Sequence, residues 1–211
     1  MRKGLFIFLC LLLLPIRAFG LTAASSRPED PRILLNGEYY DALQEALGQA
    51  RREIVLSFFL FKISGHGKNR TARIEKSLKA AVRRGVRVVV LLERSKYRDI
   101  TDTNEKTAGQ LKRGGITVFF DSPKQITHTK VAIIDRTILF LGSHNLTESA
   151  LRFNNEVSIR LHSRKAAHRL LQYLDRIHPG ILAPLRKPSR ESPYETPGRN
   201  SSLQGFGCRI K

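Results

Sequence analysis

The chain has 211 residues, a length that suits one domain with a full hydrophobic core. It carries 37 Lys and Arg against 18 Asp and Glu, a formal net charge of +19, which indicates a polyanionic partner, either nucleic acid or an anionic membrane surface. The sequence has no P-loop, no dinucleotide-binding fingerprint and no Cys/His cluster with zinc spacing, so we expect neither a nucleotide cofactor nor a bound metal.

Residues 1–20 have the outline of a secretory signal peptide. A basic start is followed by an apolar run of twelve residues from Leu5 to Ile16, which is too short to span a bilayer comfortably. Cleavage after Gly20 is the first choice and cleavage after Ala24 the second. The pattern predicts a periplasmic or secreted protein, while Arg17, close to the cleavage site, leaves an uncleaved membrane anchor as the alternative.

Strand-like and helix-like patterns alternate along the next part of the chain. Apolar runs rich in β-branched residues predict strands at 54–61, 87–93, 116–120 and 155–161. One-sided apolar spacing predicts helices at 38–52, 71–84, 104–113 and 163–177. This alternation indicates an α/β sandwich with a mixed, largely parallel sheet.

The charge belongs to the predicted folded domain and not only to its ends. Residues 21–178, which we take as this domain, hold 28 basic and 16 acidic residues. Residues 179–211 are rich in Pro, Ser, Gly and Arg with little periodicity, and they are expected to form a basic disordered tail.

The most specific pattern runs from His128 to Asn145 and reads HTKVAIIDRTILFLGSHN, in the frame H-x-K-x4-D-x6-G-S-x-N. Its first half suits a strand, and the run after Asp135 could return as the second strand of a hairpin. Residues two apart share a strand face, so His128 and Lys130 point the same way and Asp135 has the opposite parity. An imidazole beside an ammonium suits a phosphate, because one can attack phosphorus and the other can neutralise charge on oxygen.

The end of this pattern adds groups that suit an anion. Gly142 permits a tight turn and a close backbone approach to a ligand. Ser143 and Asn145 supply a hydroxyl and an amide donor. Asn145 and Glu148 stand at N-cap and N3 spacing of a short predicted helix, whose N-terminus would favour a bound anion.

The frame resembles the signature of the phospholipase D superfamily, whose members break phosphodiester bonds without a metal. The resemblance covers roughly residues 32–178, is closest to the single-motif branch with its bacterial endonucleases, and implies a phospholipase D-like α/β/α sandwich. In the superfamily one motif histidine forms a phosphohistidine, and a second protonates the leaving oxygen and later activates water. Carried over, His128 is nucleophile or acid/base, Lys130, Ser143 and Asn145 hold phosphoryl oxygens, and Asp135 is a supporting residue.

Two further expectations follow from the resemblance. Single-motif enzymes place a glutamate after the short helix, and Glu156 matches that position. It would hydrogen-bond the nucleophilic imidazole and fix its tautomer, whereas the alternative is a solvated glutamate at a strand end. The mechanism needs two histidines and the chain has one motif, so the resemblance implies a homodimer in which two copies of His128 face one phosphate.

Residues outside the motif give weaker signals. Lys68 and Arg70, beside His66, and a second basic loop are candidate substrate contacts, although both segments could be ordinary solvated loops; the second loop holds Arg94, Lys96, Tyr97 and Arg98. His144 is expected to lie beside the substrate groove. Surface roles are expected for the remaining histidines, which are His162, His168 and His178.

The leading hypothesis is a metal-independent, non-specific endonuclease that cleaves DNA or RNA through a phosphohistidine. The second is a lipid phosphodiesterase or phosphatidyl transferase at a membrane, because the motif serves both substrates and an uncleaved anchor would favour it. An RNA-processing nuclease stays open if the N-terminus is an organelle anchor. A non-catalytic nucleic-acid-binding module is disfavoured, because the motif is intact.

Overall fold

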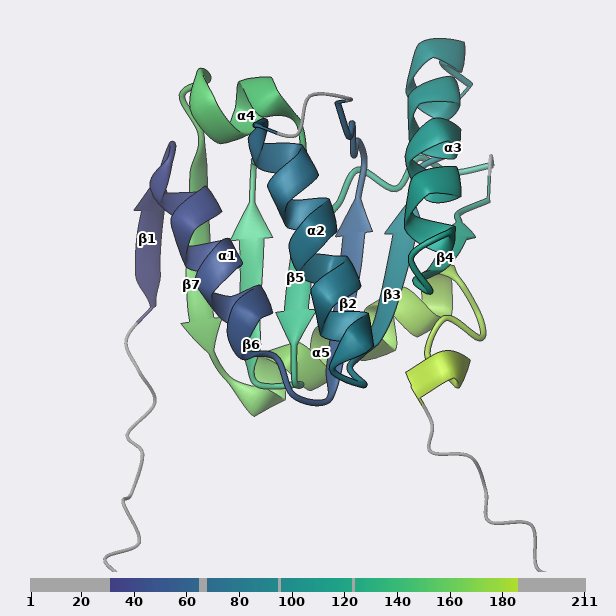
Figure 1. The fold of residues 1–211 in the computed structure, drawn as a ribbon. Helices are drawn as coiled ribbons and strands as arrows, with labels where there is room; N and C mark the ends of the chain where they lie inside the picture. The colour runs from purple at the N-terminus through teal and green to yellow at the C-terminus, as the bar shows by residue number, and fades with distance from the viewer. Residues whose placement is uncertain (1–30, 65–67, 95, 123, 186–211) are drawn as a thin grey trace, which may run out of the picture.

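The computed structural model describes residues 31–64, 68–94, 96–122 and 124–185. The predicted signal peptide, His66 and residues 186–211 therefore lie outside the described residues. The helices and strands alternate through most of the chain (Figure 1). Their bounds are β1 Arg32–Leu35, α1 Glu38–Gln49, β2 Glu53–Phe58, α2 Arg70–Arg83, β3 Arg87–Leu92, α3 Arg98–Lys112, β4 Thr117–Phe120, β5 Lys130–Ile134, β6 Ile138–Gly142, α4 Glu148–Arg152, β7 Val157–His162, α5 Arg164–Ile177 and the 3-10 turn Ala183–Leu185.

The described strands form one seven-stranded sheet in the order β1-β7-β6-β5-β2-β3-β4. The sheet is mixed, as expected, but the expectation that it is largely parallel is wrong. Only the pairs β2·β3 and β3·β4 are parallel, and the other four neighbouring pairs are antiparallel. Strand β6 returns beside β5 through the two-residue turn Asp135-Arg136, whereas β2, β3 and β4 are separated by helices α2 and α3, the kind of crossover that parallel neighbours need.

The hairpin between β5 and β6 is built by the motif sequence itself. Asp135 and Arg136 both have positive φ, 51° and 58°, and the N–H of Thr137 donates to the Ile134 carbonyl at 3.0 Å. Two consecutive left-handed residues closed by this bond make a type I′ turn, whose twist matches that of a hairpin. The predicted return at Asp135-Arg136 is therefore confirmed.

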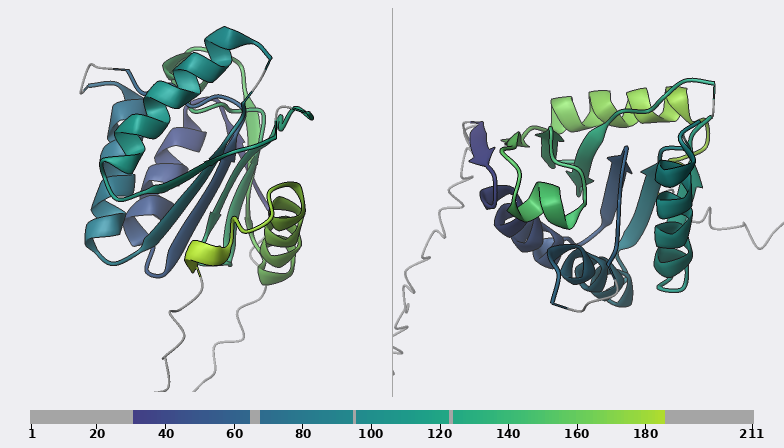
Figure 2. Two further views of the ribbon diagram at one scale, coloured as in Figure 1. Left: turned by 90° about the vertical axis from the view of Figure 1, so that its right-hand side faces the viewer. Right: turned by 90° about the horizontal axis from the view of Figure 1, so that it is seen from above.

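Helices cover both faces of the sheet, which confirms the sandwich (Figure 2). One face packs against α1, α2 and α3 in a core that includes Leu43, Ile74 and Leu111. The opposite face packs against α5 through Leu171 and Leu174. Helix α2 shows how the sequence pattern sets the buried side of a helix. Its basic residues lie on the outer side, and its buried residues recur at helical spacing, at Thr71, Ile74, Leu78 and Ala81.

The elements differ from the sequence predictions in several places. Helix α1 ends at Gln49 rather than at 52, β2 ends at Phe58 rather than at 61, and β7 begins at Val157 rather than at 155. Helix α3 begins at Arg98 rather than at 104, and β1 was not predicted as a strand. The folded chain also continues beyond residue 178, because Ile181 and Leu185 are buried in the α5-side core. That part of the expected tail is wrong, since these two side chains add apolar burial that a disordered segment cannot supply.

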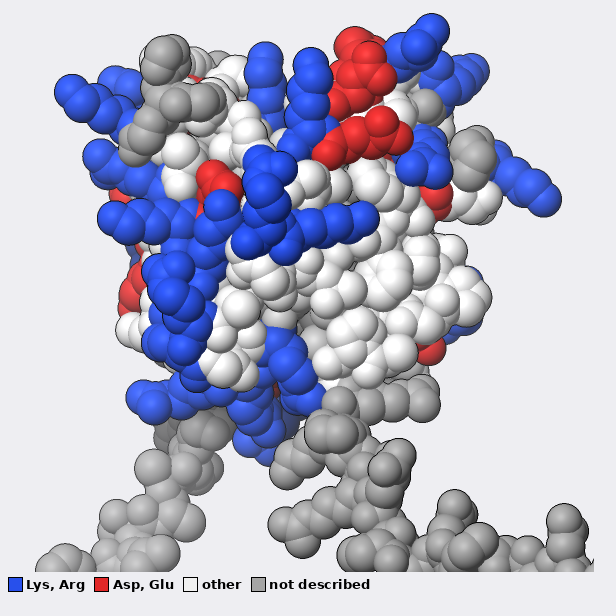
Figure 3. Space-filling model, turned by 45° about the vertical axis from the view of Figure 1, so that its right-hand side comes forward, with Lys and Arg blue, Asp and Glu red and all other residues white. Residues whose placement is uncertain are grey.

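Lys and Arg side chains are dense on the side of the molecule that carries α2 and α3, where acidic side chains are fewer (Figure 3). None of the helices in the described residues is both long and apolar enough to span a bilayer.

Candidate active site

His128 and Lys130 meet at the start of β5. Nζ of Lys130 lies 3.0 Å from Nε2 of His128 and also donates to the His128 carbonyl at 3.2 Å. The Phe59 ring flanks both, with the imidazole centroid at 4.6 Å and the ammonium at 5.1 Å from its centroid. The shared direction expected from strand parity therefore holds, although His128 itself lies just before the strand.

This arrangement fixes the chemistry of the imidazole. An ammonium can only donate, so Nε2 of His128 accepts and its proton is on Nδ1. Burial, followed by the charge of Lys130, lowers the pKa of His128 below 6.5, which keeps the exposed imidazole neutral. Burial also lowers the pKa of Lys130, and the nearby Glu156 carboxylate opposes that shift. A neutral imidazole beside a cation has a nucleophilic nitrogen and a partner for phosphate oxygen.

Ser143 and Glu156 complete this end of the sheet. The β5–β6 register pairs Val131 with Leu141, which brings the end of β6 beside the start of β5. The Ser143 hydroxyl donates to the Glu156 carboxylate and accepts the Val157 N–H at 3.1 Å. Two contact pairs thus stand at this end of the sheet, His128 with Lys130 and Ser143 with Glu156, and the Glu156 carboxylate opposes the lowering of the Lys130 pKa.

Gly142 allows this approach. A Cβ built on Gly142 would lie 2.5 Å from Cα of Ser158 and 2.5 Å from the carbonyl oxygen of Val157. Both atoms belong to the backbone of β7, which cannot move aside cheaply. The predicted need for a glycine therefore arises from the neighbouring strand.

The backbone of Glu156 is held by Asn36. The N–H of Glu156 donates to Oδ1 of Asn36 at 2.9 Å, and the N–H of Asn36 donates to the Glu156 carbonyl at 3.0 Å. Oε1 of Glu156 also accepts from Asn154 at 3.0 Å. The carboxylate thus contacts Ser143 and Asn154 in the described chain, and its contact with an imidazole stays a prediction.

His144 is buried and does not line a groove, so that expectation is wrong. Its exposed fraction is 0%, and its ring stacks on Tyr39 with centroids 4.3 Å apart. Nε2 lies 2.9 Å from the Asn36 carbonyl, an acceptor, so Nε2 carries the proton and Nδ1 accepts from Ser158 Oγ at 2.7 Å. His144 therefore supports Asn36, which in turn holds Glu156.

Asn145 is not the N-cap of the short helix. Helix α4 begins at Glu148 and its N-cap is Thr147, whose hydroxyl accepts the Ala150 N–H at 3.1 Å. Oδ1 of Asn145 is buried and has no hydrogen-bond partner among the described residues. Its role as a phosphate ligand stays a prediction.

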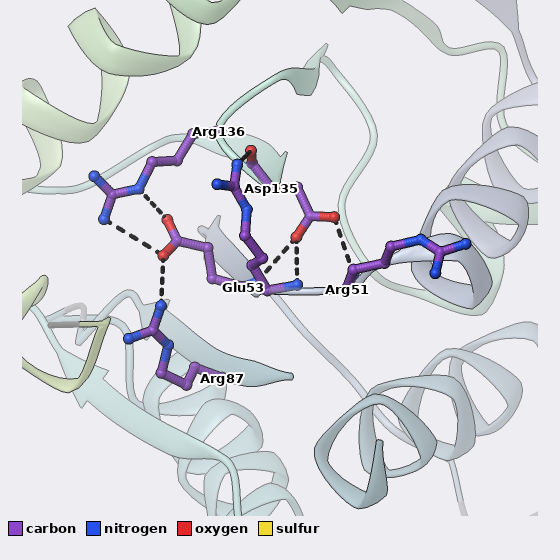
Figure 4. A network of polar contacts seen from close by, with 6 residues as sticks. Arg51, Glu53, Arg87, Asp135 and Arg136 are labelled. Atoms are coloured by element: carbon purple, nitrogen blue, oxygen red, sulfur yellow. Dashed lines mark hydrogen bonds and ion pairs between the residues drawn. The ribbon is translucent and has the colours of Figure 1, made fainter. Parts of the chain in front are cut away.

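Asp135 directly follows β5, at the end opposite His128, and is therefore not part of the reacting group. Figure 4 shows its contacts with the beginning of β2. Oδ1 accepts the N–H groups of Arg52 and Glu53 at 2.7 and 3.0 Å, and Oδ2 accepts that of Arg51 at 2.9 Å. The beginning of β2 is thus tied to the hairpin turn. The geometry agrees with the supporting role that the family resemblance implied and not with a catalytic one.

Two buried carboxyl groups beside the motif were not predicted. Glu93 and Asp121 both accept the N–H of Thr127, at 2.6 and 3.1 Å, directly before His128. Burial, followed by the hydrogen bond between the two side chains, raises the pKa of Glu93 to about 7. The sequence signal that could have revealed them is an acidic residue directly after each of two apolar strands, Glu93 after β3 and Asp121 after β4. The pair positions the segment that carries His128.

Some cations of the candidate substrate loops contact other groups of the protein, and others are exposed. The Arg70 guanidinium donates to the Leu151 carbonyl and lies 4.9 Å from the Tyr40 ring centroid. Its proposed substrate contact is therefore not supported. Lys68 is exposed and is available for a ligand. In the second loop, Arg94 pairs with Glu105 at 3.4 Å and the Lys96 ammonium lies 5.6 Å from the Tyr97 ring centroid, while Arg98 is exposed.

Within the described parts of the chain, no group of three or more His, Cys, Asp or Glu side chains gathers to hold a metal ion. The cations and hydroxyl of the candidate site suit a phosphate better than a metal. Metal independence remains a prediction that needs a direct test.

Comparison with known proteins agrees with this geometry. The family described as "Cardiolipin synthase, PLD-like domain" matches residues 43–178. Cardiolipin synthase B of Escherichia coli (strain K12) is 32% identical over 127 residues, which covers 54% of this chain and 29% of that protein. A phospholipase D of Rickettsia felis is 37% identical over 101 residues, 48% of each chain. The chain thus spans half or less of the length of these two relatives.

Solved structures share the fold. Nuc from Salmonella typhimurium, a phospholipase D family member, superposes with a TM-score of 0.59 at 23% identity, over 70% of this chain and 94% of that one. NucT from Helicobacter pylori superposes with a TM-score of 0.58 at 21% identity and the same coverage. Together with the match over residues 43–178, these findings show that the chain belongs to the phospholipase D family, with a phospholipase D-like domain of the cardiolipin synthase type.

Proposed function

We propose that the protein is a metal-independent phosphodiesterase that cleaves nucleic acid through a phosphohistidine. The observation that carries the proposal is the contact between Nε2 of His128 and the Lys130 ammonium at 3.0 Å. It identifies Nε2 as the unprotonated nitrogen of an exposed imidazole, next to a cation. When the ammonium turns to a phosphoryl oxygen, it releases the Nε2 lone pair for attack on phosphorus.

The chemistry proceeds in two displacements. Nε2 of His128 forms a bond to phosphorus, and the bond from phosphorus to the leaving oxygen breaks. A second imidazole, which enters this step as the imidazolium, gives its proton to that oxygen and becomes the neutral base that then takes one from water. The water oxygen attacks phosphorus, the N–P bond breaks, and His128 is restored. Lys130 and Ser143 stabilise the charge on the phosphoryl oxygens in both steps.

The second imidazole comes from another copy of the chain in this proposal. One chain supplies a single motif histidine, and His144, the other histidine of the motif segment, is buried. Beside Ser143 and Glu156, the sheet face left open by α5 exposes four large apolar side chains. These are Ile33, Leu35, Leu141 and Val157, with exposed fractions of 65%, 50%, 38% and 58%. Register pairs Leu35 with Val157 and places Ile33 and Leu141 on either side of Ile159, so they form one patch suited to a second copy.

Subunit mixing tests the shared site. Heterodimers of wild-type and His128→Ala subunits are expected to lose most activity, since each site needs both histidines. Full activity of every wild-type subunit in such heterodimers would overturn the shared site. Ile33→Lys, which charges the apolar patch without touching the motif, is expected to shift the dimer toward monomer in light scattering and to lower activity in parallel.

The charge of the chain supports nucleic acid as the substrate. The net charge is +19, and Lys and Arg side chains gather over part of the face that Figure 3 shows, next to a large area without charge. Contacts to phosphates give affinity without reading sequence, which supports a non-specific nuclease.

A substrate panel in EDTA decides the reaction and its substrate. It includes plasmid, single-stranded DNA, RNA, phospholipid vesicles and a small phosphodiester, each with wild type and His128→Ala. Cleavage of nucleic acid that persists in EDTA, falls with added salt and disappears in the variant is the expected result. A strict requirement for a divalent metal contradicts the proposed chemistry.

A lipid phosphodiesterase is the second candidate, because relatives of the chain are named for cardiolipin. They include the cardiolipin synthase B above and a mitochondrial cardiolipin hydrolase of Mus musculus, 28% identical over 135 residues. Release of headgroup or lipid exchange from vesicles, without nicking of plasmid, would select this function.

Export to the periplasm or beyond is part of the leading proposal, and N-terminal sequencing of the mature chain tests cleavage after Gly20.

A further inference from the structure

A groove of about 620 Å³ is lined by residues of α2 and by residues at the end of α3. Both helices lie on the side of the sheet opposite α5 (Figure 2). Arg73 and Lys76 of α2 form one wall, and Arg113, directly after α3, stands on the other. Ile63, Ser64 and Gln110 contribute to the lining. The reacting group described above does not include any of these residues, so the groove is a separate feature.

The cations of the groove are free to bind a ligand. Arg73, Lys76 and Arg113 are exposed, and none of them has an ion-pair partner among the described residues. The acidic lining residue, Glu75, is paired with Lys79 at 2.5 Å. Acidic residues of α3 stand in its first half, at Asp99, Asp102 and Glu105, away from the end that carries Arg113.

The shape and spacing suit a chain of phosphates. Residues three apart on a helix are about 4.5 Å apart along its axis, so Arg73 and Lys76 place two positive charges one after the other along α2. Arg113 faces them from the neighbouring helix. Cations on both walls of a groove can hold one strand between them, and such contacts act on the backbone of any sequence.

One end of the groove leads toward the motif. Ile63 and Ser64 follow directly on Lys62, whose N–H donates to the Leu146 carbonyl at 2.9 Å. Leu146 follows the motif residue Asn145, and its strand-like bridge to Phe61 fixes the two segments side by side. A strand that lies in the groove can therefore continue toward the reacting centre.

From these observations we infer that the groove between α2 and α3 binds the phosphodiester backbone of the nucleic-acid substrate outside the reacting centre. This inference rests on the proposed function. The groove favours nucleic acid over a bilayer, because a bilayer presents a broad surface and none of the exposed large apolar side chains of the described residues belongs to the groove lining. It also assigns a role to the basic outer side of α2.

The test compares two triple variants with equal loss of charge, both in the full chain with His128→Ala so that substrate is not cleaved. The groove variant carries Arg73→Gln, Lys76→Gln and Arg113→Gln. The control carries Lys165→Gln, Arg169→Gln and Arg176→Gln on exposed positions of α5, across the sheet. Circular dichroism and thermal melting establish that both are folded. Binding of a fluorescein-labelled single-stranded 30-mer is measured by anisotropy from 50 to 300 mM salt.

The groove variant is expected to bind at least tenfold more weakly at 100 mM salt, and its log–log salt slope should be shallower by about two, since each lost phosphate contact on a single strand removes about 0.7. The control should bind within threefold of the parent, with an unchanged slope. Equal losses in both variants would show that only net charge matters and would overturn the inference. Loss of binding to phosphatidylglycerol vesicles, with oligonucleotide binding intact, would overturn it in favour of a membrane surface.

These readouts are separate from those of the proposed function. If the substrate panel shows no cleavage of nucleic acid but the groove variant alone loses binding, the nuclease proposal fails and the binding site stands. If cleavage is found but the two triple variants behave alike, the reverse holds.

Discussion

Asn36 and Glu156 are joined by two hydrogen bonds, one in each direction, although they are far apart in the sequence. Asn36 has a positive φ of 49°, which turns its side chain back onto the strand that follows Glu156. The buried His144 donates to the carbonyl of the same asparagine. The placement of the Glu156 carboxylate beside Ser143 thus depends on residues at the end of β1.

Asn36→Gly isolates the asparagine side chain, because glycine keeps the left-handed backbone and removes the acceptor of the Glu156 N–H. We expect the free energy of unfolding to fall by about 1 kcal/mol and kcat to fall about tenfold, with a smaller change in KM. Steady-state kinetics and urea unfolding measure these effects. Asn154→Ala, which removes an exposed contact to the same carboxylate, should change kcat less than threefold. Unaltered kcat in Asn36→Gly contradicts the positioning role.

Asp135→Asn tests whether the motif aspartate is structural. The amide keeps one acceptor oxygen but presents an NH2 group to a backbone N–H, and asparagine tolerates the left-handed φ. We expect the free energy of unfolding to fall by about 1–3 kcal/mol in urea titrations. Asp102→Asn, on the exposed side of α3, should be neutral. Loss of kcat in a fully stable Asp135→Asn protein would instead assign Asp135 to the chemistry.

Gly142→Ala and Gly48→Ala form a matched pair with opposite signs. A Cβ at Gly142 meets the backbone of Val157 and Ser158, whereas one at Gly48 meets nothing within 4 Å. We expect Gly142→Ala to destabilise the protein by more than about 2 kcal/mol. Gly48→Ala, inside α1, should raise stability by up to about 1 kcal/mol. Thermal melting of both variants measures this, and a tolerated Gly142→Ala would disprove the close approach of β6 to β7.

Glu93→Gln mimics the protonated acid. The pKa of Glu93 is raised from 4.5 to about 7, so the folded state holds this proton more tightly than the unfolded state. The corresponding stability is fully present below pH 4.5 and is lost as the pH rises through about 7. The variant should therefore gain stability relative to wild type between pH 5.5 and pH 8.5, measured by urea unfolding. Glu105→Gln, half exposed, should show no such trend. If the variant and the wild type differed in free energy of unfolding by the same amount at pH 5.5 and at pH 8.5, the raised pKa of Glu93 would be contradicted.

The acid limb of kcat/KM should report on His128. Because burial and Lys130 lower its pKa below 6.5, the neutral imidazole persists to lower pH and the limb lies below pH 6.5. In Lys130→Gln, the pKa of His128 should rise, as measured by NMR titration of the imidazole. Lys165→Gln removes an exposed lysine at the start of α5, near the hairpin turn at the other end of β5, and serves as the control. A His128 midpoint above 6.5 in the wild-type chain would rule out the neutral ground state.

Much of the candidate site could be predicted because the motif is local. The spacing of His128 and Lys130 set their common direction, and the left-handed pair Asp135-Arg136 closed the hairpin where expected. Predictions failed where a residue's role depends on distant partners. His144 occupies the position of the motif that any residue type can fill, so the motif predicts nothing about it. Its burial is explained by the Tyr39 ring and the Asn36 carbonyl, which come from another part of the chain.

The family, the order of most helices and strands, and the candidate residues for attacking and holding a phosphate all follow from the amino-acid sequence. Each of these depends on spacing within a short segment, where strand or helix geometry fixes which side chains share a face. The folded chain was needed to show that four of the six strand pairs are antiparallel, that Asn36 holds Glu156, and that Glu93 and Asp121 share the N–H of Thr127. These contacts form between segments that are distant in the chain, because burial removes water and polar groups must then find partners in the protein.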